Sequence, residues 1–314
     1  MFISSLSFSL RIISPIILIV AIGYFLRVKG VISRTALPLF NRLIFYLFLP
    51  VTIFHSTYHA NLKIQGMLKA SILCVSAPLL VYILTYIILK RSKENNGRKS
   101  VIIHGISCGG IAMVGLPLAT FLFEGEHLGI VSIIVSLMAT EVTVFAILSY
   151  YIFSDEKIES KKMFSEVFKS PFTLSIILGL LLNLFSIELP GVLLTVVDNL
   201  SRVTAPFAFV VLGAGINLSS TGTNRKVLLY TISGKLIILP LTMFVTGLLF
   251  GLSGPALVTA VILAAAPASI AIISMASEMN CDVELASDHA FLSTFFSGIT
   301  IFLWIFIFRY FGFF

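Results

Sequence analysis

Two ionisable side chains, Glu141 and Lys235, stand in long apolar stretches of the sequence. A charge within the hydrocarbon core of a membrane is costly, so ionisable residues there usually face a pathway, a ligand or an opposite charge. Glu141 could therefore tune a binding site or carry a coupling proton, and Lys235 could balance the carboxylate of a substrate. Two structural alternatives stay open: the two side chains pair with each other, or Lys235 extends to the cytoplasmic surface.

Glycines and prolines mark two places where an apolar helix would be interrupted. Residues 104–117 contain four glycines and end on Pro117, and residues 263–269 place Pro267 among alanines. Proline lacks an amide hydrogen and clashes with the preceding turn. Unsatisfied backbone is tolerated in a membrane only where it lines a cavity or is buried in protein. Half-helices beginning at these prolines would direct their positive amino-terminal ends at the membrane midplane, which favours an anion.

The two breaks define a predicted substrate site for a small organic anion such as a carboxylate. Its residues are Cys108, Gly109, Gly110, Ala112, Met113, Pro117, Ala265, Pro267, Ala268, Ser269 and Lys235. Glu141 is assigned to coupling or to the transport pathway. The alternative is a pair of ordinary proline kinks, which membrane helices tolerate. Under the site hypothesis, Pro117→Ala should impair transport more than it impairs folding.

The composition places these residues in an all-α membrane protein. Of 314 residues, 58% are hydrophobic and 11% are charged, against roughly 25% charged in an ordinary soluble domain. A soluble fold of this length could not bury so much apolar surface, and the continuous apolar runs favour helices over a transmembrane barrel. At about 20 residues per span, ten transmembrane helices are predicted. They are Leu6–Leu26, Thr35–Phe54, Lys69–Leu89, Val101–Phe123, Leu128–Phe153, Pro171–Ile187, Val192–Leu218, Val227–Phe250, Pro255–Met279 and Leu285–Phe308.

Lysine and arginine are concentrated in alternate loops, and this sets the predicted orientation. Basic residues gather at 27–34, 90–99, 157–169 and 225–226. The positive-inside rule therefore predicts that these loops are cytoplasmic and that both termini lie outside. The net charge of +7 is accounted for in this way, so no nucleic-acid partner is expected.

Prolines recur at similar positions in the two halves of the chain. The pairs are Pro50 with Pro206, Pro78 with Pro240 and Pro117 with Pro267, at offsets of 156, 162 and 150 residues. Five helices per half would give the second half the opposite orientation, and such an inverted repeat is typical of transporters. The predicted organisation is a first five-helix repeat at 1–153, a cytoplasmic linker at 154–170 and a second five-helix repeat at 171–314.

No pattern in the chain predicts an enzyme, a metal site or a cofactor. The three cysteines lack metal-ligand or disulfide spacing. The segment Gly105-Ile-Ser107-Cys-Gly109 matches the G-x-S-x-G pattern, but that motif requires a strand–turn–helix context. Here it lies in a predicted membrane helix, where the same glycines fit helix packing. An intramembrane serine hydrolase acting through Ser107 is the alternative.

Motifs along nearly the whole chain resemble the auxin efflux carrier family, which includes plant PIN carriers and bacterial malate and malonate permeases. They are Gly23-Tyr-Phe-Leu-Arg, Asn41 through Pro50, Gly115-Leu-Pro117-Leu, Ala205-Pro206 through Leu212-Gly213, Ala265-Ala-Pro267 and Leu292-Ser293-Thr294. Two positions depart from the family, because Gly110 and Ala271 stand where many members carry asparagine.

The resemblance implies a ten-helix inverted-repeat fold, shared with bile acid:sodium symporters, in the plasma (inner) membrane. The first, second, sixth and seventh helices would form a scaffold domain, and helices three to five and eight to ten a transport domain. Broken helices four and nine would cross at the substrate, and the transport domain would move like an elevator. A homodimer is implied by the PIN carriers. The alternative is a membrane sensor that binds a ligand in this fold without moving it.

Overall fold

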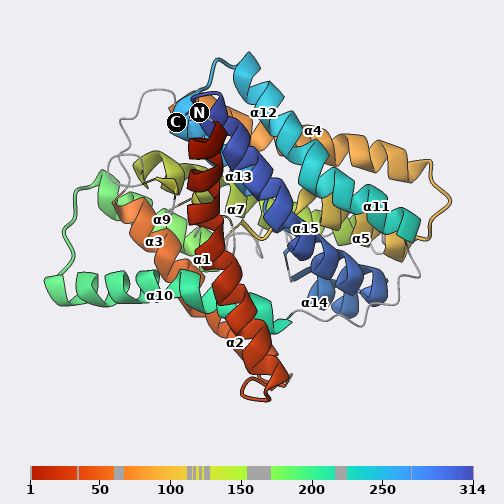
Figure 1. The fold of residues 1–314 in the computed structure, drawn as a ribbon, viewed down its shortest axis with the longest axis horizontal. Coiled ribbons are helices and arrows are strands. Elements are labelled where there is room, and N and C mark those ends of the chain that lie inside the picture. The colour runs from red at the N-terminus through yellow and green to blue at the C-terminus, as the bar shows by residue number, and fades with distance from the viewer. Residues whose placement is uncertain are drawn as a thin grey trace.

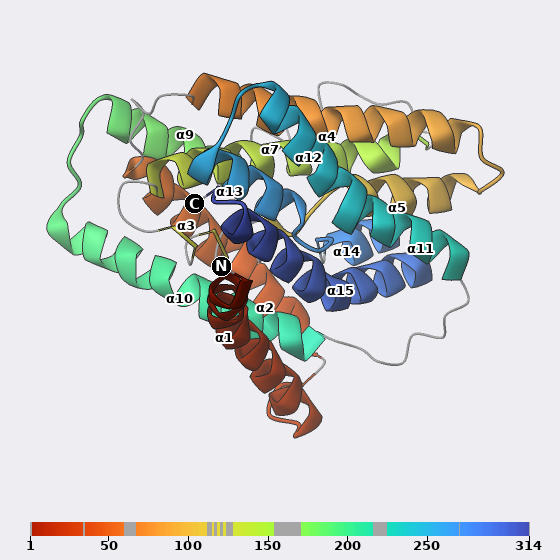
Figure 2. The same cartoon turned by 45° about the horizontal axis from the view of Figure 1, so that its top comes forward.

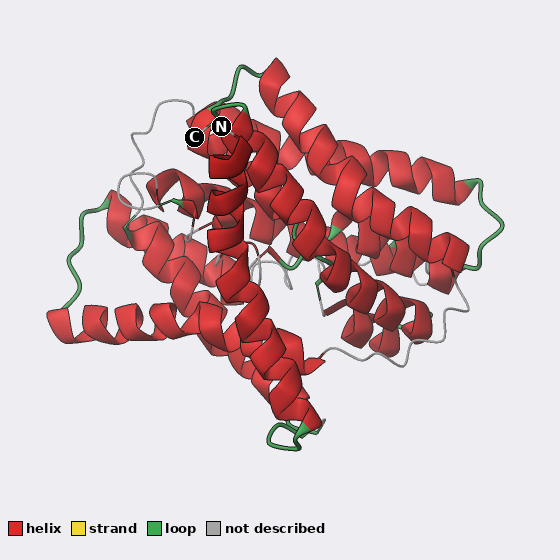
Figure 3. Cartoon of the chain, viewed as in Figure 1, coloured by secondary structure: helices red, strands yellow, loops and turns green. Residues whose placement is uncertain are grey.

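Helices make up all the regular elements in the described part of the chain (Figure 3). The computed structural model describes residues 2–33, 35–59, 67–111, 115, 118–119, 122–123, 128–153, 171–215, 225–269 and 271–313. The helices are α1 (Phe2–Val28), α2 (Leu37–Leu43), η1 (Ile44–Phe48), α3 (Leu49–Tyr58), α4 (Met67–Lys90), α5 (Asn96–Ser107), α7 (Leu128–Tyr151), α9 (Pro171–Leu184), α10 (Gly191–Gly215), α11 (Arg225–Ser233), η4 (Gly234–Ile238), α12 (Leu239–Leu249), α13 (Gly254–Ala264), α14 (Ala271–Glu278) and α15 (Val283–Tyr310).

Six helical stretches within the described residues are long and apolar enough to cross a membrane. They are Leu37–Tyr58, Leu68–Lys90, Ile133–Tyr151, Gly191–Gly215, Arg225–Leu249 and Val283–Tyr310. They overlap the second, third, fifth, seventh, eighth and tenth predicted spans, and the protein is accordingly an integral membrane protein. The stretches predicted as the fourth and ninth spans are interrupted, since α5 ends at Ser107 and α13 is separate from α14. A total of ten spans and an inverted repeat stay predictions.

Two of these stretches contain a π-helical turn immediately before a proline-containing turn. The π turn η1 precedes Leu49-Pro50, and η4 precedes Leu239-Pro240. Proline cannot donate the helical hydrogen bond, and its ring crowds the carbonyl four residues earlier, so a wider turn relieves the conflict. The prolines within α1, α4 and α10 lie in helices that continue without such a turn. Lys235 belongs to η4.

The helices pack as two groups. The smaller bundle contains α1, α2, η1, α3, α9 and α10, and the larger bundle contains α4, α5, α7, α11, η4 and α12 to α15. In Figures 1 and 2, α1 and α2 cross α10 on one side of the molecule, and α4, α11 and α12 lie on the opposite side. Contacts of α1 with α15 and of α3 with α7 join the bundles.

Close backbone contact holds α1 against α10 in the smaller bundle. Gly23 lies against the Val210 carbonyl, and Gly213 lies against the Val20 carbonyl, so that a methyl group on either glycine would overlap the other helix. Glycine allows this approach because it has no Cβ. Between membrane helices such packing contributes more than the hydrophobic effect, since lipid is as apolar as the side chains.

α13 lies at the centre of the larger bundle. Its residues from Ala256 to Ala264 are buried, and it contacts α4, α7, α12 and α15. A helix that is apolar on every side is suited to this position. The chain therefore leaves α13, at Ala265, deep inside the larger bundle rather than at its surface.

Candidate functional site

The two interrupted segments meet in the larger bundle. After α5 ends, Cys108 is extended (φ −100°, ψ 113°), and Gly109 forms an isolated antiparallel bridge with Ala268. The Gly110 N–H donates a hydrogen bond to the Pro267 carbonyl at 2.6 Å. Each segment thus supplies backbone partners to the other, which satisfies groups that would be costly to leave bare in a membrane.

The second break leads into the amino-terminal end of α14. Ala265, Pro267 and Ala268 are buried, and Ser269 is half-buried. The Ser269 hydroxyl accepts a hydrogen bond from the Ala271 N–H at 3.3 Å, as serine often does at a helix start. The first backbone N–H groups of α14, which carry the positive end of the helix dipole, therefore begin next to the bridge.

Lys235 lies directly beside the first break. Its side chain is 1% exposed, and a methyl group on Gly109 would come within 2.7 Å of the Lys235 Nζ. Gly109 therefore leaves the space that the ammonium group occupies. The burial also shows that Lys235 does not extend to the cytoplasmic surface, so that alternative is wrong. Among the described residues, no ion pair to the Lys235 Nζ is found.

Glu141 faces the same region from α7. Its side chain is 9% exposed, and its Oε1 is buried without a hydrogen-bond partner in the described part of the protein. Glu141 and Lys235 interact electrostatically through space, but no direct ion pair joins these two described residues. The Cys108 thiol lies 3.7 Å from the carbonyl of Val142, the residue after Glu141, which places the first break against this part of α7.

The remaining predicted site residues, Ala112, Met113 and Pro117, lie outside the described residues. Gly115 is described and buried, and a methyl group there would meet the Leu263 side chain. The structure therefore brings together Cys108–Gly110, Ala268 and Lys235, with Glu141 nearby.

Sequence reasoning missed two buried histidines of this region. His289 on α15 is hydrogen-bonded through both ring nitrogens, to the Gly105 carbonyl at 3.0 Å and to the Thr231 hydroxyl at 3.1 Å. His104 on α5 is fully buried, and neither of its ring nitrogens has a partner in the described part of the chain. Both could have been found by the rule that singled out Glu141 and Lys235, because both lie in or beside predicted spans.

The G-x-S-x-G segment shows no serine–base contact among the described residues. Ser107 is the last residue of α5, and its buried hydroxyl has no hydrogen-bond partner among the described residues. A serine nucleophile needs a base within hydrogen-bond reach. His289 instead bonds Gly105 and Thr231. Nor does any group of three histidine, cysteine, aspartate or glutamate side chains gather as metal ligands in the part that the structure describes.

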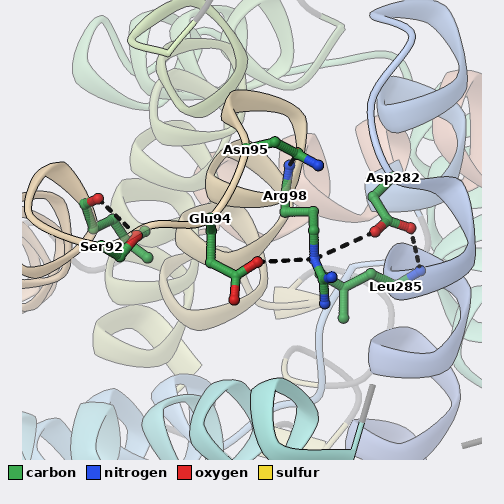
Figure 4. Close-up of polar contacts among 7 residues, drawn as sticks. Ser92, Glu94, Asn95, Arg98, Asp282 and Leu285 are labelled. Atoms are coloured by element: carbon green, nitrogen blue, oxygen red, sulfur yellow. Dashed lines mark hydrogen bonds and ion pairs between the residues drawn. The ribbon is translucent and has the colours of Figure 1, made fainter. Parts of the chain in front are cut away.

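An ion cluster joins α5 to α15 at the starts of both helices (Figure 4). The Arg98 Nε lies 3.2 Å from Glu94 and 3.6 Å from Asp282. The Asp282 side chain also accepts a hydrogen bond from the Leu285 N–H at 2.9 Å and so caps α15. The helix that ends in the first break is thereby tied to the helix that carries His289.

The fold and the site together define a class of protein. Interrupted membrane helices that meet beside buried ionisable side chains are typical of secondary transporters. The chain belongs to the membrane transport protein family, whose model matches residues 8–167 and 157–305. This match confirms the resemblance to the auxin efflux carriers. The protein is therefore a membrane transporter.

Two archaeal relatives cover nearly the whole chain. An uncharacterized transporter of Methanothermobacter thermautotrophicus is 24% identical over 299 residues, which are 94% of this chain and 97% of that protein. An uncharacterized transporter of Methanocaldococcus jannaschii is 23% identical over 297 residues, 92% of this chain and 95% of that protein. The similarity covers more than nine tenths of the chain in both relatives, so it includes both interrupted segments.

Proposed function

We propose that this transporter carries a small organic anion, with a carboxylate bound between the two breaks beside Lys235. The observation that carries the proposal is the buried Lys235 Nζ, which lies against Gly109 at the contact of the interrupted segments. A buried ammonium group is costly without an opposite charge. A carboxylate at this position supplies that charge and also approaches the amino-terminal end of α14.

Glu141 gives the site a second ionisable group. Its unpartnered Oε1 and its electrostatic interaction with Lys235 mean that its protonation changes the net charge available to a substrate. A protonated Glu141 leaves the Lys235 charge uncompensated and favours anion binding. An ionised Glu141 opposes anion binding. This linkage is the basis of the proposed role in proton coupling.

The transport mechanism that we propose is elevator-type alternating access. Ten spans would form two inverted repeats, with the smaller bundle as scaffold and the larger bundle as the moving transport domain. The larger bundle contains Lys235, Glu141 and both breaks, so the site would move as a unit. We further propose a plasma-membrane location in the lipid bilayer, a homodimer, and both termini outside.

The test is current from proteoliposomes on a solid-supported membrane. Mono-, di- and aromatic carboxylates are added in turn, with and without a pH step. We expect a substrate-specific current that Lys235→Gln removes and Lys226→Gln retains, because Lys226 is exposed near the start of α11. Loss of current in both variants, or in neither, would contradict the assignment of Lys235. Binding detected by thermal stabilisation, without flux by current or tracer exchange, would instead support a sensor.

A further inference from the structure

One face of α15 contacts both interrupted segments. His289 reaches the Gly105 carbonyl near the end of α5, and the Ser293 hydroxyl accepts a hydrogen bond from the Ala268 N–H at 3.2 Å. The two residues are four apart, so they lie one turn from each other on the same side of the helix. Both are buried. We call His289 and Ser293 the α15 clamp.

The bond from His289 satisfies a carbonyl that the broken helix leaves bare. In a continuous helix, the Gly105 oxygen would accept from the N–H of Gly109. Here the backbone leaves helical geometry at Cys108, which is extended (φ −100°, ψ 113°), so Gly109 does not continue the turn. A carbonyl oxygen only accepts, so the His289 Nε2 carries hydrogen and donates to it. The His289 Nδ1 lies 3.1 Å from the Thr231 hydroxyl, which also bonds the Val227 carbonyl of α11. His289 thus connects α5, α11 and α15.

The space for this histidine depends on Gly105. A methyl group at Gly105 would come within 2.8 Å of the His289 Nε2 and Cδ2. The ring therefore packs flush against the backbone of α5 at the position where the helix is about to end. His289 therefore restrains the last turn of α5 in two ways, by packing against the Gly105 backbone and by donating a hydrogen bond to the Gly105 carbonyl.

The hydrogen bond to Ser293 satisfies a backbone group at the second break, as the bond from His289 does at the first. The Ala268 N–H belongs to the residue that bridges Gly109, and Ser293 is its hydrogen-bond acceptor. Ser293 itself donates to the Ala290 carbonyl in its own helix at 3.2 Å. The hydroxyl is therefore oriented by α15 and presents a lone pair to the break.

A second tie fixes the register of α5 against α15. Arg98 and Asp282 join the starts of the two helices, and seven residues separate Arg98 from Gly105 and Asp282 from His289. Two ties therefore stand about 10 Å apart along each helix. Because the spacing is the same on both helices, α5 and α15 keep a constant register between the Arg98–Asp282 contact and the Gly105–His289 contact.

We infer that the α15 clamp sets the separation of the two breaks, so that His289 and Ser293 are positioning residues of the substrate site. The inference rests on the proposed function in one respect, because that function is what makes the contact of the two breaks a substrate site. The geometry of the clamp itself is testable without any substrate.

The first test is hydrogen–deuterium exchange of the purified protein in lipid nanodiscs. In Ser293→Ala the Ala268 N–H loses its acceptor, and we expect exchange in residues 266–269 to rise about tenfold. His289→Asn is expected to raise exchange in residues 108–110, because its shorter side chain cannot reach the Gly105 carbonyl. His289→Gln places an amide N–H near the original Nε2 and should restore most of the protection.

Thr294→Ala is the matched control. Thr294 neighbours Ser293, but its hydroxyl bonds the Ala290 carbonyl within α15 at 2.7 Å and so reaches neither break. We expect wild-type exchange at both breaks in this variant. Unchanged exchange at the breaks in Ser293→Ala and His289→Asn would overturn the inference. A uniform rise across the larger bundle, or failure of glutamine to improve on asparagine, would also overturn it.

The second test uses whichever carboxylate gives a current. Ser293→Ala and His289→Asn should raise the half-saturating concentration about tenfold, with His289→Gln and Thr294→Ala close to wild type. An unchanged half-saturating concentration would refute the positioning role even if local exchange rises. If no carboxylate gives current or binding, the proposed function fails, and the exchange result still decides whether the clamp holds the breaks.

Discussion

The two bundles solve the problem of packing helices in a membrane in opposite ways. In the smaller bundle, glycines bring backbones into contact, and Gly179 adds to the α1–α10 pair by lying against Thr57 of α3. Its buried side-chain hydrogen bonds include Thr52 with Thr204, which joins α3 to α10 at 2.8 Å. In the larger bundle, buried histidine, glutamate and lysine side chains stand among apolar helices, and several of their polar atoms lack partners among the described residues.

This difference suits the smaller bundle to a structural role and the larger bundle to a chemical one. Polar atoms that are buried without partners are uncommon in proteins and call for a reason. Among the described residues, His104, Ser107 and Glu141 carry such atoms close to the first break, and the proposed substrate site would give them a reason. The smaller bundle has the close packing expected of a support.

Gly213→Ala should damage the fold most. Its methyl group would overlap the Val20 carbonyl, and neither helix backbone can yield cheaply. We expect a loss of about 3 kcal/mol or more, at the upper end of overpacking, seen as a lower melting temperature and poor monodispersity. Gly215→Ala lies in the same helix with open space around it. That control should be as stable as wild type or slightly more stable, and equal damage in both variants would refute the contact.

Gly109→Ala should impair transport rather than folding. The methyl group would approach the Lys235 Nζ to 2.7 Å, but this is the end of a flexible side chain that can shift. We expect the half-saturating concentration of the transported anion to rise about tenfold, which corresponds to about 1.4 kcal/mol, with a nearly unchanged melting temperature. A fall in stability as large as that of Gly213→Ala would show that the breaks are structural in the same sense as the smaller bundle.

Glu141→Gln should remove pH dependence from the transport current. Glutamine resembles the protonated carboxyl, so the site would keep the uncompensated charge of Lys235 at every pH. The current should then be less sensitive to external pH, while thermal stability stays close to wild type. Glu188→Gln, at an exposed position, is the control and should keep the wild-type pH profile. Retention of that profile in Glu141→Gln would remove Glu141 from the proposed coupling.

Glu94→Gln should have the smallest effect. Glu94 and Arg98 form a partly exposed ion pair, and such pairs contribute about 1 kcal/mol or less. We expect a small, salt-sensitive fall in melting temperature. Asp282→Ala should cost more, because it removes both an Arg98 partner and the cap of α15. The reverse order would mean that the cap contributes little to holding α15 in place.

Composition and residue spacing predicted the helical membrane fold and the positions of both interruptions. Pro267 and the glycines before Pro117 signal a local backbone conflict, and such conflicts are visible in sequence. The partner of each break is not visible there. The Gly109–Ala268 bridge joins residues far apart in the chain, and the place of Lys235 beside Gly109 follows from how η4 packs against α5.

The missed residues have the same explanation. His289 bonds Gly105 across a separation of 184 residues in the sequence, and no residue pattern near either position indicates that the two are in contact. In the sequence, Ser293 is identified only as part of the Leu292-Ser293-Thr294 motif, without a role, and a serine hydroxyl commonly bonds its own helix. Only its approach to the Ala268 N–H distinguishes it.

The π turn η4 gives the position of Lys235 an unusual sensitivity to chain length. A π turn holds one residue more than an α turn and so acts as a single-residue insertion within a helix. Deleting one residue from Gly234–Ile238 would let an ordinary turn replace the π turn, so the flanking helices would keep their relative orientation while Lys235 and its neighbours within the turn would change the direction in which they face. In relatives that lack this extra residue, the positive charge would need to come from a neighbouring position in the alignment. A gap of one at this site would therefore move the Lys235 charge relative to the two breaks.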